Sequence, residues 1–277
     1  MICKNLHIAR RHLYLHHTYA HRLQTICRDA GIESKFQEFL KVSMITPTTR
    51  PELVDNCISR FKAQSYPNLE LIFIFHFSDK HKLKASIDKI RNITGISYLA
   101  LSPEMNLGAC LNTAIRNADG KFWFKIDDDD EYGKNYILDM MLAQRMTDAD
   151  VFGKVPKFIA LDGKALYLRG KFHKGHRVPV SDLQHISGAT IAARPSIVEK
   201  IPFVDNSRMG TDAVFIRMAY ASPEINVLVA DPYNFAVFRA KENSGHGHTW
   251  QISDKKLIQN GKYLGKYHTS VLNQVFF

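Results

Sequence analysis

The sequence has few cysteines and no long apolar run. Its 277 residues include four cysteines that lie far apart and form no C-x-x-C pair, so a reducing compartment is the simplest inference. No stretch of about eighteen uncharged apolar residues occurs, and no apolar run of signal-peptide length lies near the amino terminus. We therefore expect a cytoplasmic protein, at most peripheral on the cytoplasmic face of a membrane.

Acidic residues are outnumbered by basic ones. Asp plus Glu number 27 against 37 Lys plus Arg, which gives a net charge of +10. Such an excess indicates a polyanionic partner, namely nucleic acid, an anionic membrane surface or a phosphorylated substrate. The basic residues are spread along the chain rather than interleaved with aromatic residues on one element, so we expect no nucleic-acid partner.

Residues 1–40 differ from the rest, being rich in Arg, His and Leu and free of proline. Their spacing predicts one or two helices outside the main fold. Five histidines raise the question of a metal site, but no carboxylate or cysteine accompanies them. They are His7, His12, His16, His17 and His21. A basic helix that contacts a membrane surface or mediates self-association is the better interpretation.

Four adjacent carboxylates, at positions 127–130, follow an aromatic stretch that is typical of a buried strand. The local sequence offers them no cationic partner, and an unpaired buried carboxylate is strongly destabilising, so they need solvent or a cation. A solvated acidic loop is the plain alternative. A calcium loop starting at Asp127 would need Gly sixth and Glu twelfth, where the chain has Tyr132 and Leu138, and is excluded.

Strands and helices alternate between residues 41 and 150. The predicted strands are 42–46, 69–75, 96–101 and 121–126, and the predicted helices are 52–64, 78–91, 108–118 and 135–144. This alternation predicts an α/β fold with a mostly parallel central sheet flanked by helices. The four acids then lie at the carboxyl end of a strand, where ligand sites of open α/β sheets lie.

The alternation loosens after residue 150. A hairpin is predicted from 151–159 and 165–168, around the turn Asp162–Gly163. Further predicted strands are 187–193, 227–230 and 235–238, and further predicted helices are 195–200, 212–220 and a basic final helix at 253–264.

Several short motifs occur in an order that is specific, although each is weak alone. VSMITPT at 42–48 precedes a helix and QSYPNLE at 64–70. NLG at 106–108, ADG at 118–120, the acids, SGAT at 187–190 and GTD at 210–212 follow. Over roughly residues 41–250 the chain thus resembles a family 2 glycosyltransferase with the GT-A (Rossmann-like) fold. The resemblance implies a metal-dependent, inverting transfer of a hexosyl or N-acetylhexosaminyl group from a nucleotide-sugar to a hydroxyl of a glycan or glycolipid, as in surface polysaccharide synthesis.

The resemblance also implies roles for individual residues. The acids look like the family's D-x-D motif, with Asp129 as the first metal ligand and Asp127 sharing the metal or contacting the ribose. The cation would be Mn²⁺ or Mg²⁺. His248, in the segment GHGHTW at 245–250, is expected to be a further metal ligand. The residues expected to bind the nucleotide-sugar are Thr46, Pro47, Thr48, Arg50, His76, Asn106, Gly108, Asn112, Asp127 and Asp128.

Asp212 matches the position of the catalytic base in this resemblance. It would take the proton of the acceptor hydroxyl during attack on the anomeric carbon. The plainer alternative is an N-cap of the helix that follows, and Asp205 and Asp182 are the next candidates for the base. Thr211 stands where the family more often has Glu.

His76 stands where the family usually has an Asp pair that can accept from uracil N3–H. A neutral histidine can accept or donate, so UDP is the first choice for the donor and CDP stays open.

Together these patterns divide the chain into three parts. We expect a basic helical extension (1–40), a nucleotide-sugar-binding half (41–134), and an acceptor-binding half with a carboxy-terminal metal or lid segment (135–277). Two alternatives stay open. A sugar nucleotidyltransferase would need a glycine-rich first loop, which Pro47–Arg50 is not, and an inactive nucleotide-sugar-binding relative would differ by lacking turnover.

Overall fold

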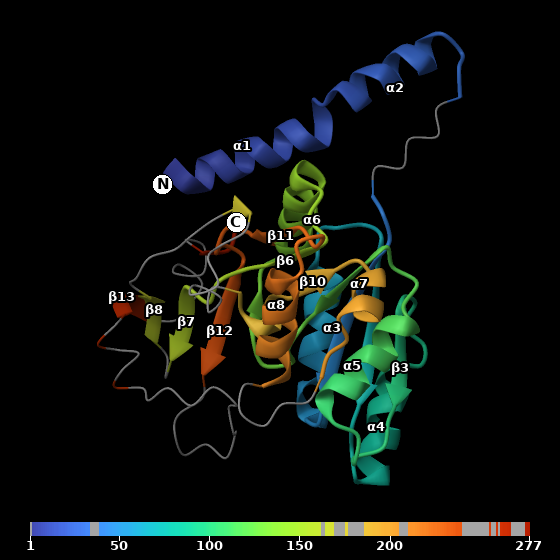
Figure 1. The fold of residues 1–277 in the computed structure, drawn as a ribbon, viewed down its shortest axis with the longest axis vertical. Coiled ribbons are helices and arrows are strands. Elements are labelled where there is room, and N and C mark those ends of the chain that lie inside the picture. The colour runs from blue at the N-terminus through green and yellow to red at the C-terminus, as the bar shows by residue number, and fades with distance from the viewer. Residues whose placement is uncertain are drawn as a thin grey trace.

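The computed structural model describes residues 2–33, 39–161, 164–168, 175–176, 186–204, 210–239, 255, 259, 261–266 and 275–277. Its centre is an eight-stranded sheet (Figure 1). The strands of this sheet are β1 (Val42–Thr48), β2 (Leu69–Phe75), β3 (Ile96–Ala100), β4 (Phe122–Lys125), β6 (Val151–Gly153), β9 (Gly175–His176), β10 (Ala192–Ala193) and β11 (Val227–Val229). The predicted α/β class and the order of the first four strands and their helices are confirmed.

The central sheet is mostly parallel, in the order β3-β2-β1-β4-β10-β6-β11-β9. β3, β2, β1 and β4 run parallel, β10 is antiparallel to β4 and β6, and β11 is parallel to β6. The predicted strand 187–193 is largely wrong. Only the two residues of β10 are a strand, which pairs with Trp123 and Phe124 of β4, and the 3₁₀ turn η3 (Gly188–Thr190) precedes them.

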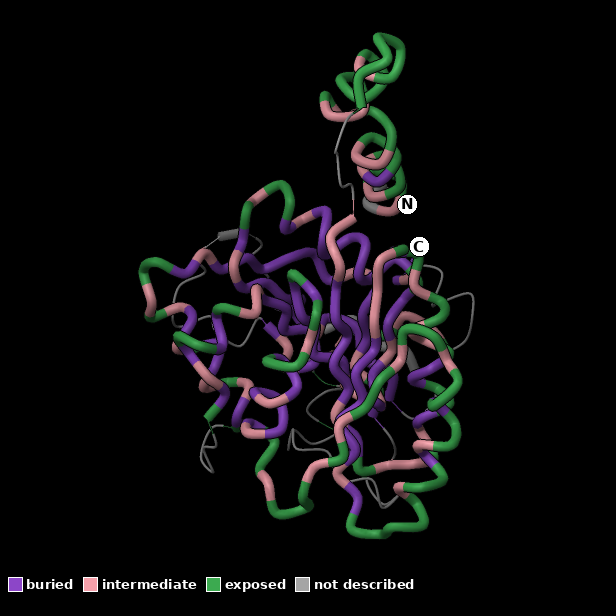
Figure 2. The backbone as a smooth tube through the Cα atoms, turned by 90° about the vertical axis from the view of Figure 1, so that its right-hand side faces the viewer, coloured by how far each residue is buried: buried purple, intermediate pink, exposed green. Residues whose placement is uncertain are grey.

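Helices cover both faces of the sheet, and their bounds are η1 (Pro51–Leu53), α3 (Val54–Ala63), α4 (Lys80–Ile90), α5 (Leu107–Arg116), α6 (Tyr136–Thr147), α7 (Ser196–Lys200) and α8 (Thr211–Ala221). Successive side chains of β4 point to opposite faces. Phe122 and Phe124 pack with residues of α3, α4 and α6, whereas Trp123 packs with residues of α5, α7 and α8. Figure 2 shows the strands as the buried centre of the molecule.

A second sheet has five strands in the order β13-β8-β7-β12-β5. Its strands are β5 (Glu131–Tyr132), β7 (Phe158–Leu161), β8 (Lys164–Leu168), β12 (Phe235–Arg239) and β13 (Gly261–Lys266). The predicted hairpin is present as antiparallel β7 and β8, but its first strand is divided, since residues 151–153 join the central sheet. The predicted final helix is wrong over residues 261–264, which pair with β8 as part of β13.

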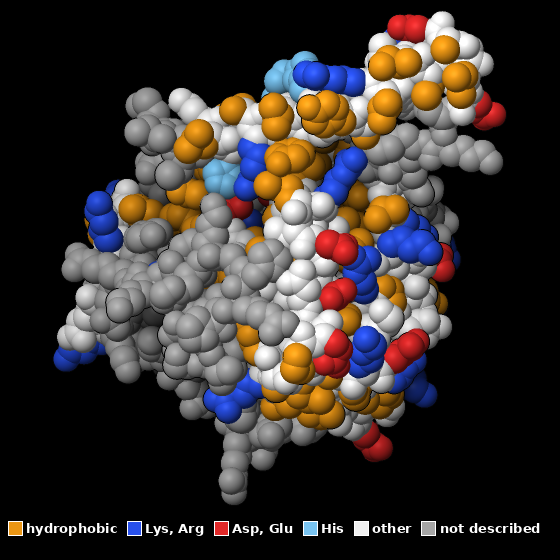
Figure 3. Space-filling model, turned by 45° about the horizontal axis from the view of Figure 1, so that its top comes forward, with side chains coloured by type: hydrophobic (Ala, Val, Ile, Leu, Met, Phe, Trp, Pro, Cys, Tyr) orange, Lys and Arg blue, Asp and Glu red, His pale blue; other side chains and the backbone are white. Residues whose placement is uncertain are grey.

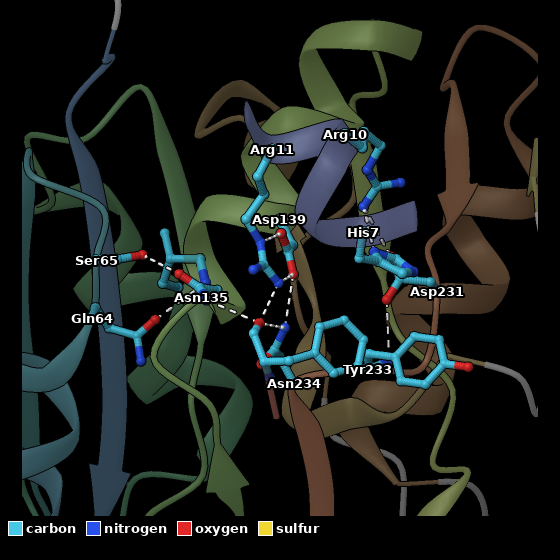
Figure 4. Close-up of polar contacts among 12 residues, drawn as sticks. His7, Arg10, Arg11, Gln64, Ser65, Asn135, Asp139, Asp231, Tyr233 and Asn234 are labelled. Carbon is cyan, nitrogen blue, oxygen red and sulfur yellow. Dashed lines mark hydrogen bonds and ion pairs between the residues drawn. The ribbon is translucent and has the colours of Figure 1, made fainter. Parts of the chain in front are cut away.

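The amino-terminal residues form two helices, α1 (Ile2–His16) and α2 (Tyr19–Asp29), as predicted. The expectation that both lie outside the main fold is wrong for α1. Arg11 donates to the buried Asp139 of α6 at 2.6 and 3.0 Å, and Asn234 donates to the same carboxylate at 2.8 Å (Figure 4). α2 has no buried residue and projects beyond the body. No described helix combines the length and hydropathy needed to cross a membrane.

Candidate active site

The four acids after β4 alternate between buried and partly exposed positions. Asp128 and Asp130 are buried, while the side chains of Asp127 and Asp129 are 31% and 21% exposed. Residues 128–130 form a bend after β4, in which Asp128 and Asp130 turn toward protein partners while Asp127 and Asp129 keep part of their side chains exposed. The two partly exposed carboxylates are therefore those available to a ligand.

Asp128 is bound within the protein. It accepts from Thr48 Oγ1 at 2.6 Å and forms an ion pair with Arg50, and its backbone oxygen accepts from Arg60 at 2.7 Å. Asp130 accepts from the Phe238 amide at 3.0 Å, and burial raises the pKa of its carboxyl well above the usual range. These two acids shape the loop, one against β1 and one against β12.

Two cations neutralise the carboxylates that face outward. Arg50 lies 3.0 Å from Asp129 while it also holds Asp128, and Lys125 Nζ lies 2.6 Å from Asp127 Oδ1. The expectation that these acids lack a cationic partner is therefore wrong. The pKa of the Asp127 carboxyl lies above its ordinary value, chiefly because of burial. The positive charge of Lys125 opposes this shift, and the negative charge of Asp212 adds to it. The sequence contained the signal: a lysine two residues before the first acid, on the same face of the strand.

Asp212 lies beside this cluster, in the first turn of α8. Its Oδ2 is 3.1 Å from Lys125 Nζ, and its Oδ1 is buried without a hydrogen-bond partner among the described residues. α8 has no side-chain cap, and its N-cap residue is Gly210, so the N-cap alternative for Asp212 is wrong. A Cβ on Gly188 would overlap the Asp212 carboxylate, so the turn η3 needs glycine there.

The residues predicted to bind the nucleotide lie at the carboxyl ends of β1 and β2 and at the start of α5. Thr46 Oγ1 is buried without a partner in the described part of the chain. The His76 amide donates to the Thr48 carbonyl, and His76 Nε2 is 2.7 Å from the Ser102 carbonyl oxygen. Pro47 precedes Thr48 in β1. These residues therefore surround one edge of the sheet, next to the acids.

The predicted α5 residues have structural contacts of their own. Asn106 accepts from the Ala109 amide at 2.8 Å and so caps α5. Asn112 donates to the Phe203 carbonyl at 2.8 Å and accepts from the Phe203 amide at 2.9 Å. A Cβ on Gly108 would lie 3.1 Å from the Phe203 oxygen. Through these two bonds Asn112 holds the chain near Phe203, and its role toward a nucleotide stays a prediction.

The chemistry of the donor set suits a hard divalent cation. Asp127 and Asp129 offer carboxylate oxygens, and Mg²⁺ and Mn²⁺ commonly bind one or two carboxylates together with phosphate oxygens and water. No group of three or more metal-ligating side chains converges within the part of the chain that the structure describes. His248 lies outside the described residues, as do Asp182 and Asp205.

Comparison with known proteins identifies the fold. The family described as Glycosyl transferase family 2 matches residues 43–201, more than half of the chain. No curated protein gives a significant match.

Solved structures show the same fold at low identity. Residues 1–349 of S. aureus TarS, in complex with UDP-GlcNAc, share 19% identity at a TM-score of 0.55, over 79% of this chain and 64% of that one. The mannosyltransferase PcManGT from Pyrobaculum calidifontis, in complex with GDP-Man and Mn²⁺, shares 16% identity at a TM-score of 0.55, over 87% and 68%. The chain spans less than two thirds of the TarS structures. Through its matched residues, this chain belongs to glycosyl transferase family 2.

Proposed function

We propose that the protein transfers a sugar from a nucleotide-sugar to a hydroxyl of a glycan or glycolipid, with inversion at the anomeric carbon. The observation that carries this is the Asp212 carboxylate: Lys125 holds one oxygen, and the other is buried without a partner among the described residues. The Asp212 side chain is 27% exposed, so a bound hydroxyl can reach the carboxylate, and a carboxylate that protein donors do not saturate is suited to accept its proton. Family membership and the similarity to TarS with UDP-GlcNAc support the donor class.

In this proposal Asp212 acts on the acceptor, whereas Asp127 and Asp129 bind the metal on the donor side. Asp212 accepts the proton of the acceptor hydroxyl as that oxygen attacks the anomeric carbon from the face opposite the leaving nucleoside diphosphate. Asp127 and Asp129, with His248, would hold Mn²⁺ or Mg²⁺ on the donor side. When bound, such a cation neutralises charge that develops on the pyrophosphate.

The donor site would use the edge formed by β1, β2 and α5. Arg50, Thr46 and His76 have polar groups at that edge. We propose a UDP-sugar as the donor, with a CDP-sugar as the alternative that the His76 position allows. Acceptor recognition is assigned to the half from residue 135 onward.

The amino-terminal helices are proposed as an attachment surface. Five large apolar side chains of α1 and α2 are more than half exposed: Leu6, Leu13, Tyr19, Leu23 and Ile26. Figure 3 shows hydrophobic side chains at the surface along both helices. Sedimentation with anionic vesicles tests peripheral membrane contact, and sedimentation velocity tests self-association. If the protein neither binds the vesicles nor self-associates, both roles are refuted.

The test of transfer is a screen of nucleotide-sugars with Mn²⁺ or Mg²⁺, scored by release of nucleoside diphosphate and by thermal stabilisation. We expect stabilisation by one donor class and slow metal-dependent hydrolysis, which accelerates when an acceptor is added. Full turnover in excess chelator would contradict the metal role. Donor binding without any turnover would favour an inactive relative, and release of inorganic pyrophosphate from a nucleoside triphosphate would favour a sugar nucleotidyltransferase.

A further inference from the structure

Lys125 is a buried cation between two carboxylates from different elements. Its side chain is 3% exposed. The ammonium lies 2.6 Å from Asp127, in the loop after β4, and 3.1 Å from Asp212, in the first turn of α8. The two carboxylates supply the opposite charges that a buried ammonium requires.

The fold explains why this lysine reaches Asp212. Trp123 and Lys125 share one face of β4, and the Trp123 ring packs against Phe215 of α8 with centroids 5.8 Å apart. Asp212 lies three residues before Phe215, which is about one helical turn. Lys125, the next side chain on that face of β4, therefore meets the carboxylate of Asp212, which lies one turn before Phe215 in α8. Gly188 leaves room for this carboxylate on its other side.

We propose that Lys125 is a positioning residue for the transfer reaction. Its ammonium holds the partly exposed Asp212 carboxylate in one orientation through Oδ2, and no protein donor among the described residues binds Oδ1. The same ammonium ties this carboxylate to Asp127 on the donor side. This inference rests on the proposed function, in which Asp212 is the base. Without the cation, the two carboxylates would repel each other in a buried site.

The kinetic test asks whether Lys125 acts through Asp212. Lys125→Met should lower kcat at saturating donor by roughly 10²-fold or more, the size of a general-base contribution. The double variant Lys125→Met/Asp212→Asn should be no slower than Asp212→Asn alone, because both changes disable one unit. A merely structural lysine predicts losses that multiply. Multiplied losses, or a near-normal kcat for Lys125→Met, would overturn the proposal.

Lys154→Met is the matched control. Lys154 is also fully buried and pairs with a carboxylate, Asp231, at 3.2 Å. Its partner Asp231 also pairs with Arg10 of α1, so Lys154 belongs to the network that holds α1. This variant should lose stability without lowering kcat, and its effects should add to those of Asp212→Asn.

A second readout needs no activity, so it separates this inference from the proposed function. If the wild-type protein transfers no sugar, the function fails, but thermal melts still report the contact. The melting-temperature losses of Lys125→Met and Asp212→Asn should be less than additive in the double variant. If Lys125→Met alone does not fold, adding Asp212→Asn should restore folding, because it removes one of two unpaired carboxylates. Fully additive losses, or no restoration, would contradict the contact.

Discussion

At the scale of single residues, Gly188 decides where the Asp212 carboxylate can lie. Gly188→Ala would force that carboxylate aside, because the added methyl would overlap it. We expect transfer to fall by about 10²-fold, the usual cost of misplacing a reacting group by about 1 Å. Gly133→Ala is the control, since its methyl would meet the Asn234 side chain in the network that holds α1. Normal activity in Gly188→Ala would show that the position of Asp212 is unimportant.

The adjacent acids Asp128 and Asp129 should behave differently although the sequence presents them alike. Asp128→Asn should destabilise the fold by about 1–3 kcal/mol, the usual worth of hydrogen bonds to a charged group, because it weakens the contacts with Thr48 and Arg50. Asp129→Asn should abolish metal-dependent transfer at nearly normal stability, because its pair with Arg50 is partly exposed. Chemical denaturation and a transfer assay of both variants test this, and equal phenotypes would contradict the division.

At the scale of elements, α1 is held to the body by a buried ion pair. Arg11→Met should destabilise the protein by about 3–5 kcal/mol, because it leaves Asp139 buried without its cation. Arg22→Ala, on the exposed face of α2, should change the stability little. Denaturant unfolding of both variants tests this. If Arg11→Met unfolds like the wild type, α1 is not docked in solution as the structure shows.

The same contact region predicts how stability depends on pH. Burial lowers the pKa of His7, and Asp231, Arg10, Asp139 and Lys154 are the charged groups around it. The folded state then binds fewer protons at His7 than the unfolded state, so stability should fall as pH drops below about 6.5. Burial would raise the pKa of Asp231, but Lys154, His7 and Arg10 lower it to about 2, so its contribution is lost between about pH 4 and pH 2.

Melts from pH 7.5 to pH 5 compare the wild type with His7→Asn, which cannot titrate there. The loss of stability near pH 6 should be smaller in the variant. Equal losses would show that His7 does not contribute to the dependence.

The helices and strands that could be predicted from the sequence are the longer ones. The longer strands and helices of residues 41–150 were predictable because each carries its own hydrophobic pattern, and β2 matches its predicted bounds. The short strands β5, β6 and β10 have two or three residues, which is too few for a period. β13 was read as a helix because Lys and Leu suit both structures, and its pairing with β8 decides the outcome.

The site was predictable as far as its motifs extend. Asp127 and Asp129 lie in the same cluster as Asp212, although Asp212 follows them in the sequence by 85 and 83 positions. The roles of Asp128 and Asn112 in holding the fold, and of Lys125 between the carboxylates, depend on which side chains meet across elements. The sequence shows the spacing of Lys125 and Asp127, but it does not show which side chains meet across elements.

At the scale of the whole molecule, the proposed catalytic residues and the contacts that hold α1 involve different residues. The acids lie at the carboxyl end of β4, whereas α1 is bound to α6 by the Arg11 network (Figure 4). Changes at the α1 network should therefore alter stability before they alter transfer. This separation lets a catalytic defect be distinguished from a folding defect by comparing activity with melting temperature.

The rate of transfer by Asp212→Asn with donor and metal, measured together with its donor affinity, tests most directly whether Asp212 is the base of a sugar transfer. We expect a rate lower by roughly 10²- to 10⁴-fold, the usual general-base contribution, with nearly unchanged donor binding and a folded protein. A near-normal rate would contradict this role and would move the search for the base to Asp205 or Asp182.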